Sequence, residues 1–297
     1  MKSILILGAT GMLGYGVLSS MVKYKNVKIS ATVRSKLKLK KLKDKFPYNK
    51  IKKFHFLDAK KTNKDKINIL FKNYDYIVNC IGVIKPEINI SNTESIKNAI
   101  FINSFFPNML AEAIHNKDKK IFQIATDCVF SGKKGMYTEN SAHDDVELYG
   151  ATKSLGEIKA KNFYNIRTSI VGREFLTKKS LIEWFLKQND VVLKGFINHN
   201  WNGITTQAFG EFLYTLIVNN LKIPNTVHII PKNVVNKYQL LKIFKDKFET
   251  RVSIQKFKAP IKIDRTLSTI YKRKIDKIWK LTSFKYNPTI RKMLDLI

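Results

Sequence analysis

The chain has 297 residues, of which 44% are hydrophobic, and its 54 Lys and Arg against 23 Asp and Glu give a net charge of +31. This length and apolar content can bury a substantial core and exclude a disordered chain, and Cys80 and Cys128 are too few for a disulfide framework or a zinc cluster. No apolar run reaches the ~18 residues of a membrane span, so we expect no membrane insertion. Glycines interrupt the apolar starting segment MKSILILGATGMLG, so we expect a cytoplasmic protein. We also expect no metal.

The positive charge comes mostly from lysine, since only seven of the basic residues are arginine. Proteins that read nucleic acids usually concentrate arginine and aromatic residues in a motif. The densest basic run, KLKLKKLKDK at 36–45, also carries Leu39, Leu42 and Phe46 at helical spacing, so its lysines fit the solvated face of an ordinary helix. We therefore expect no nucleic-acid partner, and a charge that favours an anionic small substrate.

Short β-branched or leucine-rich runs alternate with longer amphipathic segments through the first half of the chain. We expect strands at 3–7, 27–33, 52–58, 74–82, 120–126 and 164–172. Strands that alternate with helical segments predict right-handed βαβ units and a parallel sheet covered on both faces. The predicted fold class is therefore α/β, with a doubly wound parallel Rossmann sheet.

The rhythm loosens after this half, which predicts two parts. Residues 1–172 would form the dinucleotide-binding domain, and residues 173–297 a smaller α/β substrate lobe, some of whose elements could return to the sheet. In the second part we expect a helix at 179–188, an irregular stretch at 194–206, a short strand at TVHII and a helix from Tyr238.

The segment LGATGMLG follows the first strand and opens a helix, with glycines at 8, 11 and 14. The first glycine permits a tight turn, the second lets the backbone approach a pyrophosphate, and the third lets the helix pack close to the strand. Unpaired N–H groups of the helix N-terminus would bind the phosphates. The alternative is a purely structural turn, but the strand–turn–helix context favours a dinucleotide site.

At the end of the second predicted strand the sequence reads TVRS, without an acidic residue. Arg34 and Ser35 would favour the 2′-phosphate of NADP(H) over the free hydroxyl of NAD(H), although NAD(H) stays possible. Asp58 could accept from the adenine amino group, and NCIG at 79–82 would let the chain pass close to the cofactor. The full set expected to bind the cofactor is Gly8, Thr10, Gly11, Met12, Leu13, Gly14, Arg34, Ser35, Asp58, Cys80, Ile81, Gly82 and Lys153.

The segment ATDCVFSG ends the fifth predicted strand, and ELYGATKSLGE follows it with Tyr149 and Lys153 one helical turn apart. Hydride transfer to a carbonyl needs a proton donor, and a phenol becomes useful near neutral pH if a nearby cation favours its ionised form. Lys153 could be that cation, and Thr126 could hold the carbonyl oxygen. Each residue also has a structural alternative, but behind a dinucleotide turn we expect a catalytic Thr126–Tyr149–Lys153 triad.

GATGMLG, TDCVFSG, YGATKSLGE and IRTSIVGRE (166–174) together resemble the extended short-chain dehydrogenase/reductase superfamily and, within it, the dTDP-4-dehydrorhamnose reductase family. The resemblance covers most of residues 1–175. It implies NAD(P)H on the N-terminal domain, a nucleotide-sugar in the cleft, reduction of a 4-keto group with tyrosine as the proton donor, and the catalytic set Thr126, Tyr149 and Lys153. A role in surface polysaccharide or glycan biosynthesis would follow.

The sequence departs from the family pattern where the substrate would bind. Ala125 stands in place of the usual serine, Cys128 in place of a frequent tyrosine, and NHNWNGITT in place of a proline-threonine phrase that Thr205 and Thr206 could match. We therefore expect a related nucleotide-sugar reductase rather than one specific to dTDP-rhamnose. The candidate substrate-binding residues are Val83, Asp127, Cys128, Arg173, Asn200, Trp201 and Arg265.

Other readings of the same motifs stay open at this point. The triad also serves nucleotide-sugar epimerases and dehydratases, and Asp127 beside Thr126 keeps a dehydratase possible. A non-catalytic NADP-binding regulatory subunit, like the β subunit of methionine adenosyltransferase, is the alternative that is not an enzyme. A homodimer is possible through the helix that carries the triad and its neighbour at 101–114.

Overall fold

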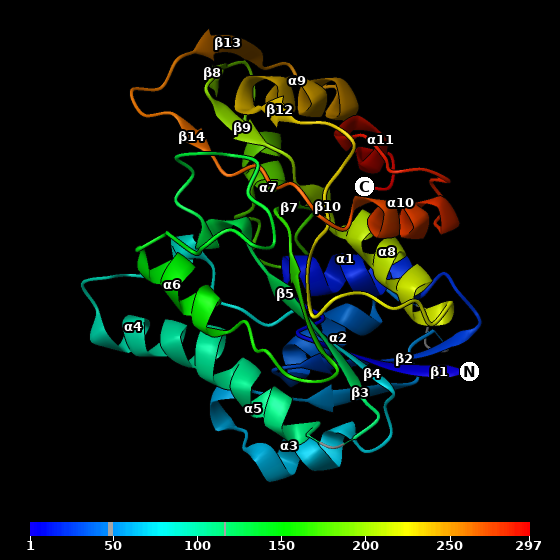
Figure 1. Cartoon of the computed structure of the whole chain (residues 1–297). Helices are drawn as coiled ribbons and strands as arrows, with labels where there is room; N and C mark the ends of the chain where they lie inside the picture. Colours follow the sequence, from blue (N-terminus) through cyan, green and yellow to red (C-terminus); the bar gives the residue numbers. More distant parts are fainter. Residues whose placement is uncertain (47–49, 116) are drawn as a thin grey trace.

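The computed structural model describes residues 1–46, 50–115 and 117–297. In these residues seven parallel strands form a central sheet in the order β11-β6-β5-β4-β1-β2-β3 (Figure 1). The strands are β1 (Lys2–Leu7), β2 (Val27–Val33), β3 (Lys53–Phe56), β4 (Tyr76–Asn79), β5 (Lys120–Ala125), β6 (Phe163–Arg167) and β11 (Thr226–His228). The predicted α/β, doubly wound class is confirmed.

The side chains of β1 explain why this sheet is buried on both faces. Ile4 and Ile6 belong to one hydrophobic cluster, whereas Leu5 and Leu7 belong to a second one, and all four are 0% exposed. Successive side chains of a strand point to opposite faces, so a strand that is apolar at every position needs a helical layer on each side.

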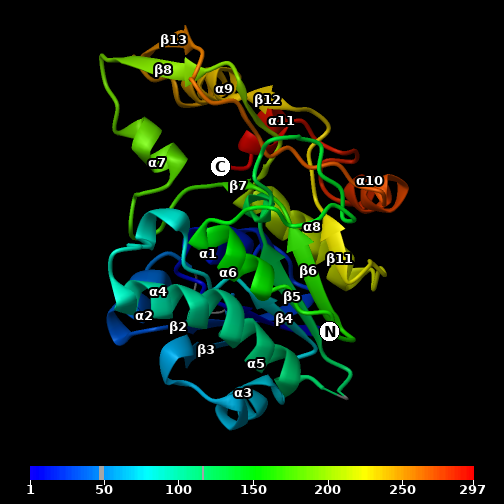
Figure 2. The ribbon, with the colours of Figure 1, turned by 60° about the vertical axis from the view of Figure 1, so that its left-hand side comes forward.

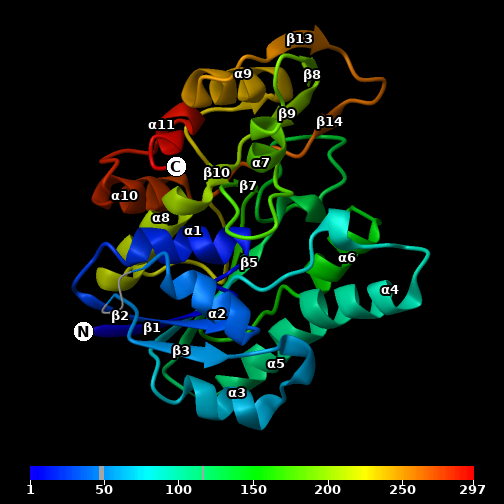
Figure 3. The ribbon, with the colours of Figure 1, turned by 180° about the vertical axis from the view of Figure 1, so that it is seen from behind.

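Helices cover both faces, as Figures 2 and 3 show. The layer with the first cluster contains α1 (Met12–Met21), α2 (Lys36–Lys43), α8 (Thr206–Val218) and α10 (Lys272–Leu281). The opposite layer contains α3 (Lys64–Phe71), α4 (Thr93–Ile100), α5 (Phe106–Ala113) and α6 (Leu148–Leu155), with a π-helix at Phe101–Phe105 and 3-10 turns at Ala59–Lys61, Lys85–Glu87 and Asp127–Val129. Within the described ranges, no helix has the length and apolar composition needed to cross a membrane.

A second lobe lies above the carboxyl edge of the sheet, with α9, β8 and β13 at the top of Figure 1. It contains β7 (Ile170–Val171), α7 (Leu181–Leu186), β8 (Val192–Phe196), β9 (His199–Trp201), β10 (Ile204–Thr205), β12 (Val235–Asn236), α9 (Lys237–Phe248), β13 (Ser253–Phe257), β14 (Ile263–Asp264) and α11 (Ile290–Leu294). The small sheets β10-β7, β12-β9-β14 and β13-β8 surround a hydrophobic cluster of their own.

Two expectations about local structure were wrong. The segment 164–172, expected as one strand, ends its first strand at Arg167, and Ile170–Val171 then pairs with β10 outside the central sheet. The segment 194–206, expected to be irregular, contains the end of β8 and all of β9 and β10. Strands of two or three residues leave too short an alternating pattern to be recognised in a sequence.

Some elements beyond residue 172 return to the first part of the chain. β11 pairs with β6, and α8 packs against α1, where a Cβ on Gly210 would lie 2.6 Å from the Ser20 side chain. The close approach of these two helices joins both parts through one core. The hydrophobic core contains residues from both sides of position 172. The division of the chain at this residue therefore stays a prediction, and it concerns function rather than two separate cores.

The buried side of α8 gives a test of this shared core, because Phe212 belongs to the same hydrophobic cluster as Ile4 of β1 and Val17 of α1. Phe212 and Trp279 are both 0% exposed, and their rings meet edge to face with centroids 4.9 Å apart. Phe212→Ala should lower the free energy of unfolding by about 3–5 kcal/mol, because it removes a buried ring and leaves a cavity. Urea unfolding measures this cost. The control is Phe105→Ala, whose ring is 54% exposed and whose loss should cost less than about 1 kcal/mol; equal costs would contradict the shared core.

Candidate functional site

The order of the strands determines where a ligand can bind. The sheet turns back on itself between β1 and β4, which are neighbours although two strands separate them in sequence. In doubly wound sheets ligands bind outside the carboxyl ends of the strands at such a reversal. The glycine turn after β1 and the segment after β4 both lie at this point, and the carboxyl end of β5 is next to them.

The glycine turn has the backbone that a phosphate cradle requires. Gly8 has a φ of +77°, a conformation that side chains rarely adopt, and a Cβ on Gly14 would lie only 2.2 Å from the Gly8 carbonyl oxygen. Gly11 precedes α1 without any side-chain cap, so the first N–H groups of the helix are not satisfied by a cap. This arrangement fits a pyrophosphate at the start of α1. Thr10, Met12 and Leu13 are part of the same turn and helix start.

The end of β4 approaches the glycine turn closely. A Cβ on Gly8 would lie 2.9 Å from the Ile81 side chain and 3.4 Å from the Cys80 carbonyl carbon. Gly82 follows, and a Cβ there would lie 3.9 Å from the Lys153 Nζ. The predicted cofactor residues after β4 are thus brought between the glycine turn and the triad. Burial raises the pKa of the Cys80 thiol, which argues against a reactive thiolate.

Arg34 and Ser35 follow β2, the strand that pairs with β1, and connect it to α2. The Arg34 side chain is exposed, and the Ser35 hydroxyl accepts from the Lys38 N–H at 3.3 Å. Burial, and next the charge of Arg34, lower the pKa of Lys38, so the two cations lie close together. The sequence analysis did not single out Lys38, because a lysine in a lysine-rich helix carries no distinguishing signal.

Asp58 follows β3 and caps a short 3-10 turn, accepting from the Lys60 N–H at 3.1 Å. It also lines a cavity of about 270 Å³ beside α3, together with His55, Phe56 and Leu57. A carboxylate that already accepts from a backbone amide has remaining lone pairs for an amino group. Its role toward adenine stays a prediction.

The predicted triad gathers at the carboxyl end of β5. Thr126 directly follows this strand and is 7% exposed, and its side chain acts to lower the pKa of Tyr149, so it lies close to this phenol at the start of α6. Lys153, 8% exposed, lies one turn further on, and its Nζ donates to the Ile124 carbonyl at 2.9 Å. Three residues from two elements therefore meet beside the segment that follows β4.

The ionisation of the triad differs from the expectation in one respect. We expected Lys153 to favour the ionised form of Tyr149, but burial, and next the charge of Cys128, raise the pKa of this phenol. Burial also lowers the pKa of Lys153 to about 8, although the charge of Glu157 acts in the opposite direction. The physical reason is that the cost of desolvating both charged forms exceeds the charge interactions at this depth. Tyr149 is therefore a neutral phenol at pH 7.

Asn103, which the sequence analysis missed, connects the triad helix to the end of β4. Its Oδ1 accepts from the Val83 N–H at 2.9 Å, and its Nδ2 donates to the Val83 carbonyl at 3.0 Å and to the Thr152 hydroxyl at 3.2 Å. It lies in the π-helix, 1% exposed. An asparagine buried in an apolar helical segment was the only available signal, and sequence alone does not reveal its partners.

Asp127 and Cys128, two candidate substrate residues, lie next to the triad. The Asp127 Oδ1 accepts from the Thr126 hydroxyl at 3.1 Å and lies 3.7 Å from the Cys128 Sγ. Burial raises the pKa of Asp127, whereas hydrogen bonding by Thr126 and the charges of Lys237 and Arg265 lower it. Burial raises the pKa of the Cys128 thiol to about 12. The charges of both residues act on the pKa of Tyr149, so both lie close to this phenol.

The other candidate substrate residues divide into two groups. Arg265 reaches the triad region, because its Nε donates to the Phe130 carbonyl at 2.7 Å and its charge acts on Asp127. Trp201 is 5% exposed, with its Nε1 donating to the Ser169 Oγ at 2.8 Å, and forms a buried wall. The remaining candidates are also held by neighbours: the Asn200 side chain donates to Asp264, the Arg173 side chain donates to Glu183, and the backbone N–H of Val83 donates to Asn103.

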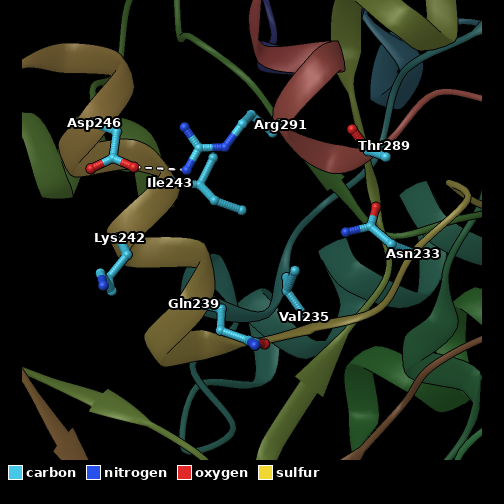
Figure 4. A pocket seen from close by; sticks show the side chains of 8 residues that line it. All are labelled: Asn233, Val235, Gln239, Lys242, Ile243, Asp246, Thr289 and Arg291. Carbon is cyan, nitrogen blue, oxygen red and sulfur yellow. Dashed lines mark hydrogen bonds and ion pairs between the residues drawn. The ribbon is translucent and has the colours of Figure 1, made fainter.

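A further cavity, of about 410 Å³, lies in the second lobe between α9 and α11 (Figure 4). Arg291 and Asp246 form an ion pair across it, with 2.7 Å between the Arg291 Nη2 and the Asp246 Oδ2. None of its lining residues belongs to the predicted site. Among the residues that the structure describes, no three His, Cys, Asp or Glu side chains are placed to hold a metal ion.

Comparisons with known proteins agree with this geometry. The family described as RmlD substrate binding domain matches residues 1–297. No curated protein sequence matches the chain.

Among solved structures, a dTDP-4-dehydrorhamnose reductase from Clostridium acetobutylicum is 23% identical, with a TM-score of 0.71 over 98% of this chain and 96% of that one. A second one, from Bacillus anthracis in complex with NADP, is 17% identical, with a TM-score of 0.72 over 99% and 98% of the two chains. A UDP-glucuronic acid 4-epimerase from Bacillus cereus, in complex with UDP-glucuronic acid and NAD, is 14% identical, with a TM-score of 0.71 over 99% and 97%. At these identities the likeness concerns the fold.

The position of Asn103 can be tested through its backbone partner. Asn103→Leu should destabilise the protein by roughly 1–3 kcal/mol for each buried group of Val83 that loses its partner. The exchange of the Val83 amide hydrogen should become faster, since its acceptor is lost. Urea unfolding and hydrogen exchange by NMR measure the two effects. The control is Asn108→Ala, an exposed amide on α5; an unchanged exchange rate at Val83 in Asn103→Leu would show that Asn103 does not hold this segment.

Proposed function

The chain belongs to the RmlD substrate binding domain family, and we propose that it is an NADPH-dependent reductase of the 4-keto group of a nucleotide-activated sugar. It is then an oxidoreductase of the extended short-chain dehydrogenase/reductase type. The observation that carries the proposal is the gathering of Thr126, Tyr149 and Lys153 in front of the glycine turn after β1. The polysaccharide pathway, the cytoplasmic location and the homodimer stay predictions from the sequence.

The residues present fit a dinucleotide. The N–H groups at the start of α1 would bind the pyrophosphate, and the glycine at position 82 leaves room for the cofactor close to the Lys153 Nζ. When bound, the nicotinamide supplies the hydride. Lys153 would donate to a ribose hydroxyl, because its ammonium already donates to a backbone carbonyl and has two further protons to give.

The protonated state of Tyr149 fits a reductase. A reductase needs a proton donor, whereas an epimerase of this type begins by removing a hydroxyl proton and needs a base. Because burial raises the pKa of Tyr149, the phenol keeps its proton at neutral pH. The neutral phenol is the form that can protonate the alkoxide produced by hydride transfer. The epimerase and dehydratase readings stay the alternatives, because a tyrosine of ordinary pKa is also protonated at pH 7.

The preference for NADPH rests on the end of β2. Arg34 is an exposed cation with Lys38 close to it, and the Ser35 hydroxyl, which accepts from the Lys38 N–H, is next to Arg34 in the chain. Two cations and a hydroxyl fit a phosphate dianion, whereas a ribose 2′-hydroxyl is usually held by a carboxylate. The solved relative from Bacillus anthracis, in complex with NADP, supports the same choice.

Tyr149→Phe tests the reaction. Reduction of 4-keto nucleotide-sugars, followed by the loss of NADPH absorbance, should fall by roughly 10²–10⁴ because the proton donor is lost. NADPH binding should stay near that of the wild type. The control is Tyr286→Phe, a phenol that is 47% exposed and should have no effect. A fully active Tyr149→Phe would remove this residue from the mechanism, and a wild type that binds NADPH but reduces no keto-sugar would favour the regulatory-subunit reading.

Arg34→Ala tests the cofactor preference. It should weaken NADPH binding by about 10- to 100-fold, the loss expected for a charge-assisted hydrogen bond, and should leave NADH binding nearly unchanged. Fluorescence titration with each nucleotide measures the two dissociation constants. Lys40→Ala is the control, because Lys40 is exposed on α2, the helix that follows Arg34. Equal losses for NADPH and NADH would mean that Arg34 does not recognise the 2′-phosphate.

A further inference from the structure

The cavity between α9 and α11 lies apart from the predicted active site, and we call it the α9–α11 cavity. Its volume is about 410 Å³, which is within the ~300–1,000 Å³ typical of small-molecule sites. Figure 4 shows the side chains that line it, which come from α9, from the start of α11 and from the segment before α9. None of them belongs to the glycine turn, the triad or the candidate substrate residues. The α9–α11 cavity is thus a separate place where a ligand could bind.

Two amide side chains line the α9–α11 cavity with their oxygens already in use. The Asn233 Oδ1 accepts from the Ile290 N–H at 2.9 Å, at the start of α11. The Gln239 Oε1 accepts from the Asn236 N–H at 2.8 Å, as part of the capping box of α9. A backbone N–H that donates to an amide oxygen determines which way the amide is turned. The free end of each amide is therefore its NH2 group, which can donate two hydrogen bonds.

These two NH2 groups are available to a ligand. In the part of the chain that the structure describes, the Asn233 Nδ2 and the Gln239 Nε2 donate to no other residue, since each amide is bonded only through its oxygen. Figure 4 shows the Asn233 nitrogen turned toward the other lining side chains. Because the oxygens are held by the backbone, the NH2 groups cannot be replaced by acceptors through a simple rotation of the amides.

The charged side chains of the α9–α11 cavity add further donors. Arg291 uses its Nη2 in the ion pair with Asp246, and its Nε and Nη1 bond to none of the described residues. Lys242 is exposed, with its Nζ 5.8 Å from the ring centroid of Tyr238. Arginine and lysine have donors only. Asp246 is the one acid among the described lining residues, and Arg291 already occupies it.

The lining therefore offers an anion several donors beside an apolar wall. The Thr289 hydroxyl accepts from the Lys292 N–H at 3.3 Å, so this oxygen is also in use. Val235, which is 6% exposed, and Ile243 supply the apolar part. Ionised phosphate oxygens accept hydrogen bonds, and arginine suits them through its planar fork of N–H groups. A phosphate joined to an organic group would use both the donors and the apolar wall.

We propose that the α9–α11 cavity binds a phosphorylated organic molecule of nucleotide size. Its phosphate is held by Arg291 and by the NH2 groups of Asn233 and Gln239, and its organic part lies against the apolar wall. This inference goes beyond the proposed function and does not depend on it, because the cavity shares no residue with the triad or the glycine turn. The second lobe thereby has a ligand of its own, outside the cleft that faces the triad.

The first experiment locates the ligand by NMR of protein with ¹³C-labelled isoleucine methyl groups. The Ile243 signal is assigned by its loss in Ile243→Val. UDP is the probe, and uridine and inorganic phosphate represent its two parts. UDP should shift the Ile243 signal with a dissociation constant below about 1 mM. Uridine and inorganic phosphate should each bind at least about tenfold more weakly, because each uses only the apolar wall or only the donors.

The second experiment replaces the free amide donors without removing the backbone bonds. Asn233→Asp keeps an oxygen for the Ile290 N–H, and Gln239→Glu keeps the capping box, in which glutamate is a usual member. Each variant replaces a donor with an ionised acceptor, so UDP binding should weaken by about 10- to 100-fold. Asn236→Asp is the control, because it adds the same charge at the N-cap of α9, outside the cavity lining, and should leave the affinity nearly unchanged.

The Ile243 signal decides the outcome. No shift at about 10 mM UDP overturns the inference. Equal affinities for UDP and uridine, or for UDP and inorganic phosphate, also overturn it, because the cavity would then not recognise a phosphate joined to an organic group. Equal losses in Asn233→Asp and in the control Asn236→Asp would reduce the effect to net charge and overturn the role of the amide donors. Weaker binding in Asn233→Asp and Gln239→Glu alone supports the inference, and no outcome bears on the reduction of a keto-sugar.

Discussion

The close approach of α1 to β1 is the constraint on which the rest of the structure depends. A Cβ at position 14 would lie 2.2 Å from the Gly8 carbonyl oxygen, so only glycine allows the helix to begin directly behind the strand. This approach leaves the N–H groups at the helix start open at the point where the strand order reverses. It also brings α1 against α8, through which the second lobe is fixed to the sheet. The open helix start that a cofactor site needs therefore follows from one backbone contact.

Burial is the second factor, because it determines the ionisation of every group near Thr126. The pKa values of Tyr149, Cys128 and Asp127 are raised, and those of Lys153 and Lys237 are lowered. Each shift follows from removing a charged form from water. In such a site the few charges that remain act strongly on their neighbours. The surface charge itself is mostly a solvated face, as the exposed lysines of α2 illustrate.

Much of the fold could be predicted from the sequence, for physical reasons. The strand Val27–Val33 was predicted with the bounds that the structure gives, because a β-branched run buried on both faces is recognisable by itself. The strand pairs of the second lobe were missed, since β9 and β10 have only three and two residues. The candidate site shows the same difference. Motifs that lie near one another in the sequence were enough to single out Thr126 and Tyr149. Asn103 acts through partners distant in sequence, and no local pattern distinguishes it from an ordinary polar residue.

The most direct test of the central claim is to follow the transferred hydrogen. With NADPH deuterated at the hydride position of the nicotinamide and a 4-keto nucleotide-sugar, mass spectrometry of the product counts the deuterium gained at the sugar. The account predicts one deuterium per sugar and one NADPH oxidised for each, because Tyr149 supplies only the proton. A product without deuterium, formed with no net loss of NADPH, would contradict a reductase and indicate that the cofactor returns to its starting state, as in an epimerase.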